Sequence, residues 1–206
     1  MNKPYVQTTR SEPRITFSAL AKLLVPHTLD AHESIVKTCK YPPTAKVINY
    51  KDGIQWLIGI VVGDGKTGGT LEAHEREVVD IVKADPIRLP KGVTAARVPQ
   101  SSAKWYLEDV EISMVPDLIL SGPKGVGVLK FHVNKEPLPR GVGPTMAALL
   151  YHYESVERQT PNVVPEYCLV YDVRSKKFHK PSGTTSSLVD RARAACRFVA
   201  YAWDRV

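Results

Sequence analysis

Over the first third of the chain, apolar residues recur three and four positions apart, which is the spacing of one face of a helix. The segments TFSALAKLL and LDAHESIVKTCK follow this pattern, and prolines stand shortly after both. Thr28 or Asp30 can cap the second segment. The run GIQWLIGIVV fits a buried helix or a strand, but its length and the glycines that follow favour a helix. We therefore expect residues 1–66 to form an N-terminal helical extension.

Beyond residue 66, helical segments alternate with short segments rich in strand-forming residues. The pattern predicts an amphipathic helix, short extended pieces, two strands around the turn SGPKG, a helix, a strand with a short partner, and a last helix. The principal predicted elements are a helix at residues 70–84, strands at 110–120 and 126–133, a helix at 145–158, a strand at 166–173 and a helix at 186–206. This order predicts an α/β fold for residues 67–206, with a central mixed sheet flanked by helices.

Composition and charge narrow the class of protein. The chain of 206 residues is 43% hydrophobic and 24% charged, as expected for a globular protein. Three widely spaced cysteines argue against a disulfide framework or a zinc cluster, and no apolar run is long enough to span a membrane. We expect a cytoplasmic protein with no membrane partner. The net charge of +7 favours an anionic partner such as nucleic acid, although a basic surface also serves solubility.

The segment VPDLILSGPKGVGVLK contains the residues with the most chemical content. Pro116 and Asp117 stand at an apolar strand, and Lys130 lies on the next strand beyond the turn. Together with the order of elements, this pattern resembles the PD-(D/E)XK nuclease superfamily over residues 70–206. The resemblance implies a PD-(D/E)XK-like central mixed sheet, a divalent metal held by Asp117, and a catalytic pair in which Lys130 positions or activates the attacking water. Mg²⁺ suits such oxygen ligands and would be the cofactor of an active enzyme.

The second acid of that family's pattern is missing from its usual position. Residues two apart on a strand face the same side, and the family's acid stands two positions before its lysine. Here that position holds Val128, which cannot bind a metal ion. Three explanations stay open: the acid has moved to another element, the fold has kept a binding role without hydrolysis, or the match is accidental. The candidates for a moved acid are Glu154 and Glu157 on the following helix, and Glu72, Glu75 and Glu77 on the preceding one.

Basic residues surround the predicted hairpin and continue on the last helix. If they lie together they form a stripe that could follow a phosphate backbone, made of Lys124, Lys130, Lys135, Arg140, Arg193 and Arg197. We expect a nucleic-acid-associated protein on a nuclease-like scaffold, with DNA as its partner. The scaffold is expected to be divergent or catalytically inactive, and an inactive protein would need no cofactor. Two alternatives remain. One is a protein-interaction module, such as a phage or defence-system factor that contacts a protein partner, and the other is an active Mg²⁺-dependent nuclease with a moved acid. The sequence predicts no oligomeric state.

Overall fold

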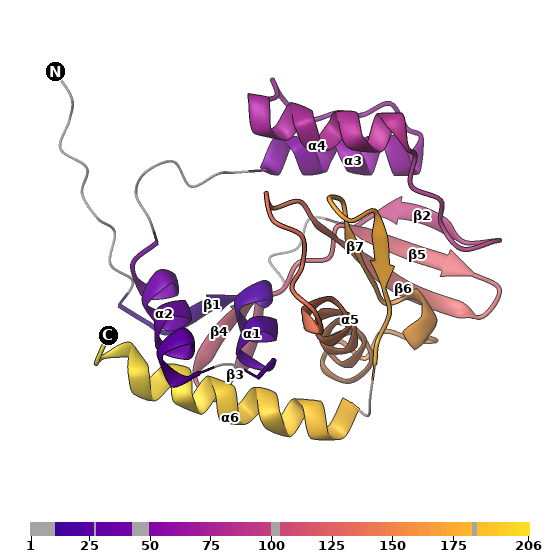
Figure 1. The fold of residues 1–206 in the computed structure, drawn as a ribbon. Coiled ribbons are helices and arrows are strands. Elements are labelled where there is room, and N and C mark those ends of the chain that lie inside the picture. The colour runs from indigo at the N-terminus through magenta and orange to yellow at the C-terminus, as the bar shows by residue number, and fades with distance from the viewer. Residues whose placement is uncertain (1–10, 27, 43–49, 100–103, 183–184) are drawn as a thin grey trace, which may run out of the picture. The chain divides into compact units, whose positions relative to one another are not determined.

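The structure is a computed structural model, and it describes the chain apart from residues 1–10, 27, 43–49, 100–103 and 183–184 (Figure 1). The chain forms two compact units, each assembled from segments that are distant in sequence. The first unit comprises Met1–Asn49, Ala103–Met114 and Thr184–Val206, and the second comprises Tyr50–Ser102 and Val115–Gly183. Neither unit has a boundary at residue 66, where the sequence suggested a division between a helical extension and a core.

The first unit consists of a three-stranded sheet and three helices. The strands lie in the order β1 (Arg14–Thr16), β4 (Val110–Ser113) and β3 (Lys104–Leu107), with β1 parallel and β3 antiparallel to β4. The helices are α1 (Phe17–Leu23), α2 (Leu29–Lys40) and α6 (Thr185–Trp203). Because side chains alternate along a strand, Ile15, Trp105 and Ile112 are buried on the face that these helices contact.

The second unit is built on a five-stranded mixed sheet. Its strands lie in the order β2 (Thr94–Arg97), β5 (Leu118–Gly122), β6 (Gly125–His132), β7 (Leu169–Asp172) and β8 (Lys177–His179). β6 and β7 are parallel, and the other neighbours are antiparallel. The helices are α3 (Lys51–Val62), α4 (Ala73–Ala84) and α5 (Val142–His152), with a π-helical turn η1 (Tyr153–Glu157) after α5 and a 3₁₀ turn η2 (Pro165–Tyr167) before β7. The chain therefore has a mixed α/β fold, as the sequence predicts.

The two faces of the five-stranded sheet bury different residues. In Figure 1, α3 and α4 lie on one side of this sheet and α5 on the other. Leu118, Leu129 and Leu169 belong to the core that α3 and α4 complete, and alternation turns Val128 and Lys130 toward the opposite face. α3 is thus a core helix of the second unit, although the sequence assigned it to an N-terminal extension.

Local signals at the helix ends agree with the sequence analysis. The Thr28 hydroxyl oxygen accepts a hydrogen bond from the Ala31 N–H, so that Thr28 rather than Asp30 caps α2. Thr16, which the sequence analysis did not single out, caps α1 in the same way through the Ala19 N–H. Gly63 ends α3 in the left-handed conformation, with a φ of 74°. This conformation favours glycine, and the expected glycine C-cap is confirmed.

The predicted strand at residues 110–120 is wrong in its first half. Residues 110–113 form β4 of the first unit, and β5 begins only at Leu118 in the second. Pro116 lies between them, and because proline has no N–H to donate to a sheet, it favours a break there. The antiparallel pairing of the second half is confirmed, since β5 pairs with β6 around a turn at residues 123–124.

The helix expected at residues 145–158 starts earlier and changes its type. α5 begins at Val142, so Pro144 lies within the first turn rather than at its start. After His152 the helix widens, and the Arg158 N–H donates to the Tyr153 carbonyl five residues earlier, at 2.9 Å. In the described part of the chain, no helix is long and apolar enough to cross a membrane.

Candidate functional site

The β5–β6 hairpin brings Asp117 and Lys130 together. Leu118 pairs with Leu129, so Asp117, directly before β5, stands opposite Lys130. The Lys130 Nζ lies 2.9 Å from the Asp117 Oδ1, and the Phe131 N–H donates to the Asp117 Oδ2 at 2.7 Å. The two side chains are 8% and 23% exposed for Asp117 and Lys130. Both carboxylate oxygens of the motif's aspartate are therefore occupied by partners from β6.

A small pocket lies beside Val128, the residue two positions before Lys130. It has a volume of about 80 Å³ and is lined by Pro116 and Val128 from the sheet, and by Glu154 from the π-helical turn. Glu154 is only 2% exposed, although it is a carboxylate. Among the five acids that the sequence offered as replacements, Glu154 alone lines this pocket.

The Glu154 carboxylate also has a partner at each oxygen. Its Oε1 accepts from the Arg158 Nη1 at 3.2 Å, and its Oε2 accepts from the Thr160 Oγ1 at 2.9 Å. Burying a carboxylate is costly unless such partners compensate it. Glu154 belongs to the π-helical turn, and the residues that hold it follow directly after that turn; such turns are frequent at functional sites. No sequence signal pointed to Arg158 and Thr160, because their contact with Glu154 depends on this non-standard turn.

The other candidate acids lie elsewhere. Glu157 lies 3.4 Å from the His152 imidazole, at the end of α5. Glu72, Glu75 and Glu77 are at the N-terminal end of α4, across the sheet from Val128. The Glu75 carboxylate accepts hydrogen bonds from backbone N–H groups, and Glu77 pairs with Arg174. None of these four carboxylates replaces the missing acid.

The two carboxylates on this face of the sheet are each paired with a cation. Among the described residues, no three His, Cys, Asp or Glu side chains are grouped so that they could hold a metal ion. Mg²⁺ is held in many proteins by one or two carboxylates with water. Here Asp117 would have to release Lys130, and Glu154 would have to release Arg158. Cys168, next to this face, is no nucleophile either, because burial raises the pKa of its thiol to about 12.

The six basic residues expected to form a stripe are divided between the units. Lys124, Lys130, Lys135 and Arg140 belong to the second unit, and Arg193 and Arg197 to the first. Four of the six have an acidic partner: Lys124 pairs with Glu166, Lys130 with Asp117, and both arginines with Glu108. Lys135 and Arg140 are exposed in the loop before α5, and neither forms an ion pair with a described residue.

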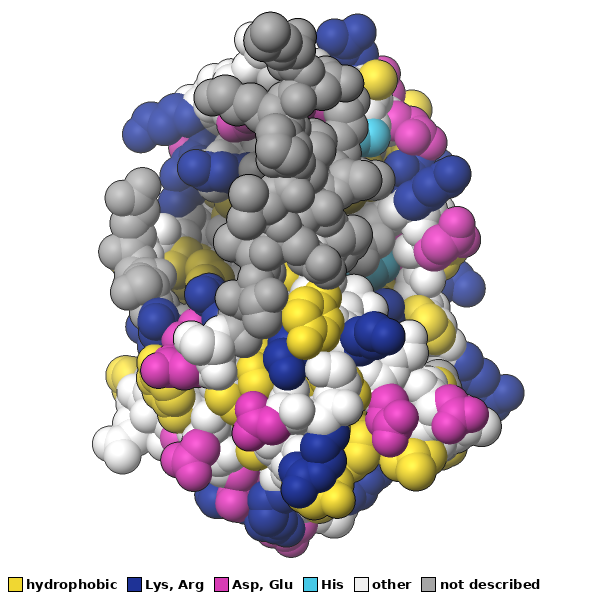
Figure 2. Space-filling view, turned by 90° about the vertical axis from the view of Figure 1, so that its left-hand side faces the viewer, with side chains coloured by type: hydrophobic (Ala, Val, Ile, Leu, Met, Phe, Trp, Pro, Cys, Tyr) yellow, Lys and Arg dark blue, Asp and Glu magenta, His cyan; other side chains and the backbone are white. Residues whose placement is uncertain are grey.

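The surface view agrees with this division of charge. Over the face seen in Figure 2, the coloured Lys and Arg side chains are interspersed with Asp and Glu side chains, and no continuous basic patch is visible among them. Of the six basic residues, Lys135 and Arg140 are the two whose charge no ion pair with a described residue neutralises.

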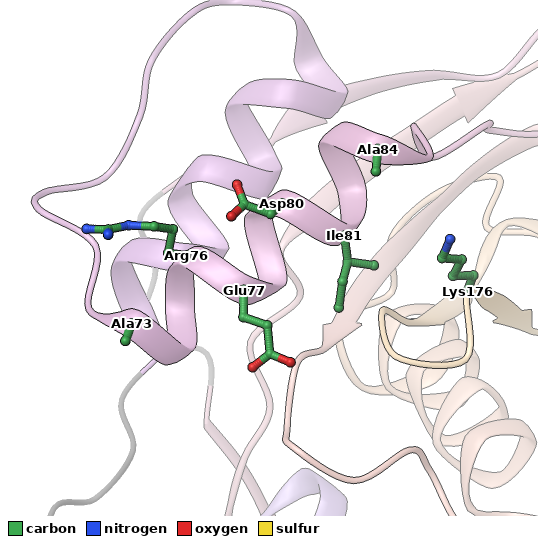
Figure 3. A pocket seen from close by; sticks show the side chains of 7 residues that line it. All are labelled: Ala73, Arg76, Glu77, Asp80, Ile81, Ala84 and Lys176. Atoms are coloured by element: carbon green, nitrogen blue, oxygen red, sulfur yellow. The ribbon is translucent and has the colours of Figure 1, made fainter.

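A wider, open pocket lies along α4 (Figure 3). It has a volume of about 570 Å³ and is lined by one face of the helix and by the turn between β7 and β8: Ala73, Arg76, Glu77, Asp80, Ile81, Ala84 and Lys176. Its two acids balance its two bases. Glu77 also binds Arg174, and Lys176 binds Asp85. This pocket has no group poised for catalysis, and the pocket beside Val128 remains the candidate site.

Comparisons with protein-family models, with curated proteins and with solved structures found no match for this chain.

Proposed function

We propose that the protein binds nucleic acid through its five-stranded unit, a divergent PD-(D/E)XK-like scaffold that does not hydrolyse its ligand. The observation that supports this most directly is the Asp117–Lys130 pair at the start of β5, beside a pocket where Val128 takes the position of the second acid. The motif's two polar residues are adjacent, but they neutralise each other.

The arrangement of elements supports the nuclease-like scaffold. A helix precedes the antiparallel strands β2, β5 and β6, with β3 and β4 of the other sheet inserted between β2 and β5, and α5 then connects β6 to the parallel strand β7. Asp117 and Lys130 meet on two neighbouring antiparallel strands. This is the relation that the resemblance implies, and an accidental Pro-Asp turn would not require it.

The loss of hydrolysis follows from charge. The Lys130 Nζ lies 2.9 Å from the Asp117 Oδ1. Its positive charge would therefore repel a metal ion that approaches the Asp117 carboxylate. Val128 offers no oxygen, and it is 4% exposed. The site thus lacks the negative charge that concentrates a divalent cation.

The loop between β6 and α5 supports the binding of an anionic chain. Lys135 and Arg140 are exposed there, at the end of the strand that contains Lys130. The net charge of the protein is +7, which favours association with a polyanion. Phosphate contacts of this kind need no base recognition, so they give affinity without sequence preference.

Binding can be tested with labelled DNA by fluorescence anisotropy over a range of salt concentrations. Replacing Lys135 and Arg140 by alanine should weaken binding and flatten the salt slope by up to about one unit for each lost phosphate contact. Lys37→Ala, on the exposed face of α2, is a charge-matched control. No binding by the parent at low salt, or equal affinity in all variants, would overturn the proposed function.

A second candidate is an active Mg²⁺-dependent nuclease in which Glu154 replaces the missing acid. The observation that favours it is the shared pocket: Glu154 lines it together with Val128 and Pro116. In this case Glu154 must exchange its bonds to Arg158 and Thr160 for a metal ion. The hydrolytic candidate therefore requires a rearrangement that the non-hydrolytic one does not.

Mn²⁺ titration and a cleavage assay separate the two candidates. We expect weak Mn²⁺ binding and no cleavage by the parent, and tighter Mn²⁺ binding by Val128→Glu. Because an unpaired buried carboxylate destabilises a fold, unfolding of that variant must be measured alongside. Mg²⁺-dependent cleavage by the parent, abolished both by Asp117→Ala and by Glu154→Gln, would favour the nuclease instead.

A further inference from the structure

The sheet of the first unit has one face that its helices do not cover. Along β1, β4 and β3, every second residue is buried, and the residues between them are exposed or partly exposed. The strand register sets them in two rows across the sheet, one of Arg14, Glu111 and Tyr106, and the other of Thr16, Ser113 and Lys104. This open face therefore offers two cations, one acid, one aromatic ring and two hydroxyl groups.

A single carboxylate organises the charged side chains of the open face. Glu111 Oε1 lies 2.9 Å from the Arg14 Nε, and its Oε2 lies 2.8 Å from the Lys104 Nζ. The hydrogen bond between Lys104 and Glu111 lowers the pKa of the acid and raises that of the amine, so both stay charged near neutral pH. One acid is shared by two cations, and a positive charge is left over. Arg14 and Lys104 side chains each remain 47% exposed.

The same carboxylate holds the aromatic ring. The Tyr106 hydroxyl donates to the Glu111 Oε2 at 3.2 Å, while Tyr106 as a whole stays 62% exposed. The ring is thus fixed at its polar end and accessible to solvent. An exposed tyrosine that is held in this way loses little conformational entropy when a planar group stacks on it.

We propose that the open face of the β1–β4–β3 sheet binds single-stranded nucleic acid, with a base stacked on Tyr106 and phosphates beside Arg14 and Lys104. Stacking on exposed aromatic rings, combined with nearby cations, is the general way in which proteins hold unpaired strands. Neighbouring strands of a sheet are about 5 Å apart, so the face is about 10 Å wide and suits one strand rather than a duplex. The Arg14 guanidinium forms an ion pair with Glu111 through its Nε, and its Nη2 donates to the Ser113 Oγ at 3.2 Å, which leaves N–H groups for a phosphate.

This inference rests on the proposed function, which supplies nucleic acid as the class of ligand. It adds that the nucleic acid is single-stranded and that it binds a second surface, on the first unit. It uses none of the residues of the five-stranded unit. The two proposals can therefore fail separately.

The test compares a short fluorescein-labelled oligothymidine with a duplex of equal length, by anisotropy at low salt. We expect the parent to bind the single strand more tightly, and Tyr106→Ala to weaken that binding by at least about fivefold. Tyr106→Phe keeps the ring and should retain affinity. Arg14→Ala and Lys104→Ala should each lower the salt slope for the single strand by up to about 0.7.

Tyr201→Ala provides the matched control, because Tyr201 is also 62% exposed but lies on α6. Tyr106 is exposed, so its variants should fold, and circular dichroism checks this. Single-strand binding that is equal in the parent and in Tyr106→Ala would overturn this inference and leave the proposed function intact. If the parent binds neither probe, both this inference and the proposed function are overturned. If the open face binds a protein and the parent has no affinity for nucleic acid, the face is a protein-binding surface instead.

Discussion

The Asp117 carboxylate has two partners of different kinds, and both come from β6. The pairing of β5 with β6 begins at Leu118 and Leu129, so Phe131 lies beyond its end. The Phe131 N–H therefore donates to the Asp117 side chain in place of a strand carbonyl. The Lys130 ammonium group neutralises the charge. A motif residue that resembles a metal ligand thus stabilises the end of a hairpin, and this contribution can be measured.

Replacing Lys130 by methionine should destabilise the protein by about 2 kcal/mol, because it leaves the poorly exposed Asp117 carboxylate without its cation. The free energy of unfolding in urea measures the loss. The double variant Asp117→Asn with Lys130→Met should recover part of it, since no unpaired charge remains. A loss below about 0.5 kcal/mol would mean that the pair behaves as an exposed ion pair.

His179 is predicted to make the stability of the protein depend on pH. Its ring packs against Gly143, where an added Cβ would lie 2.4 Å from the His179 Cγ. Burial lowers the pKa of His179, with Asp172 opposing this and Lys177 adding to it. A histidine whose folded pKa lies below about 6.5 binds more protons when unfolded, so its contribution is present above that pH and is lost as the pH falls.

Unfolding experiments at several pH values test the role of His179. The free energy of unfolding should decline between about pH 7 and pH 5 in the parent, and this part of the decline should be smaller in His179→Gln. Identical pH profiles for the two proteins would contradict this prediction.

At the scale of elements, one carboxylate joins two helices. Glu75 lies in the first turn of α4 and is 3% exposed. Its Oε1 accepts from the Asp52 and Gly53 N–H groups at the start of α3, at 3.1 and 3.0 Å, and its Oε2 accepts from the Glu72 N–H at 3.1 Å. The first turns of both helices thus depend on Glu75, through hydrogen bonds and through the attraction between an acid and the positive end of a helix.

Glu75→Ala should therefore lower the free energy of unfolding by about 2–3 kcal/mol, which is more than the usual loss at a single cap. Asp80→Ala, at an exposed position of the same helix, should change it by less than about 0.5 kcal/mol. Urea unfolding of the two variants gives the comparison. Equal effects would show that the shared cap adds nothing.

At the scale of the whole molecule, the chain passes between the two units several times, yet each unit has its own buried core. Leu20 is fully buried in the first unit, and Leu169 is fully buried in the second. Replacing a buried leucine by alanine costs about 2–5 kcal/mol. We expect Leu20→Ala to reduce hydrogen-exchange protection mainly in α1, α2 and β4, and Leu169→Ala to reduce it mainly in β5–β7. Uniform loss of protection in both variants would show that the two units unfold as one.

The sequence determined the features that depend on a few neighbouring residues. The threonine caps of α1 and α2, the glycine at the end of α3 and the turn between β5 and β6 follow from local backbone chemistry. The opposition of Asp117 and Lys130 follows as well, because the length of a hairpin turn fixes which residues pair.

Only the tertiary structure decided the features that depend on distant segments. Residues 110–113 read as a continuation of the next strand, but they pair with β1 and β3 in another sheet. The sequence offered Glu154 as one of five candidate acids, and only the structure shows that it is buried beside Val128, in a π-helical turn. Periodicity acts within a few residues, whereas sheet partners, ion pairs and pockets are set by packing between segments far apart in the chain, and that packing leaves no local signal in the sequence.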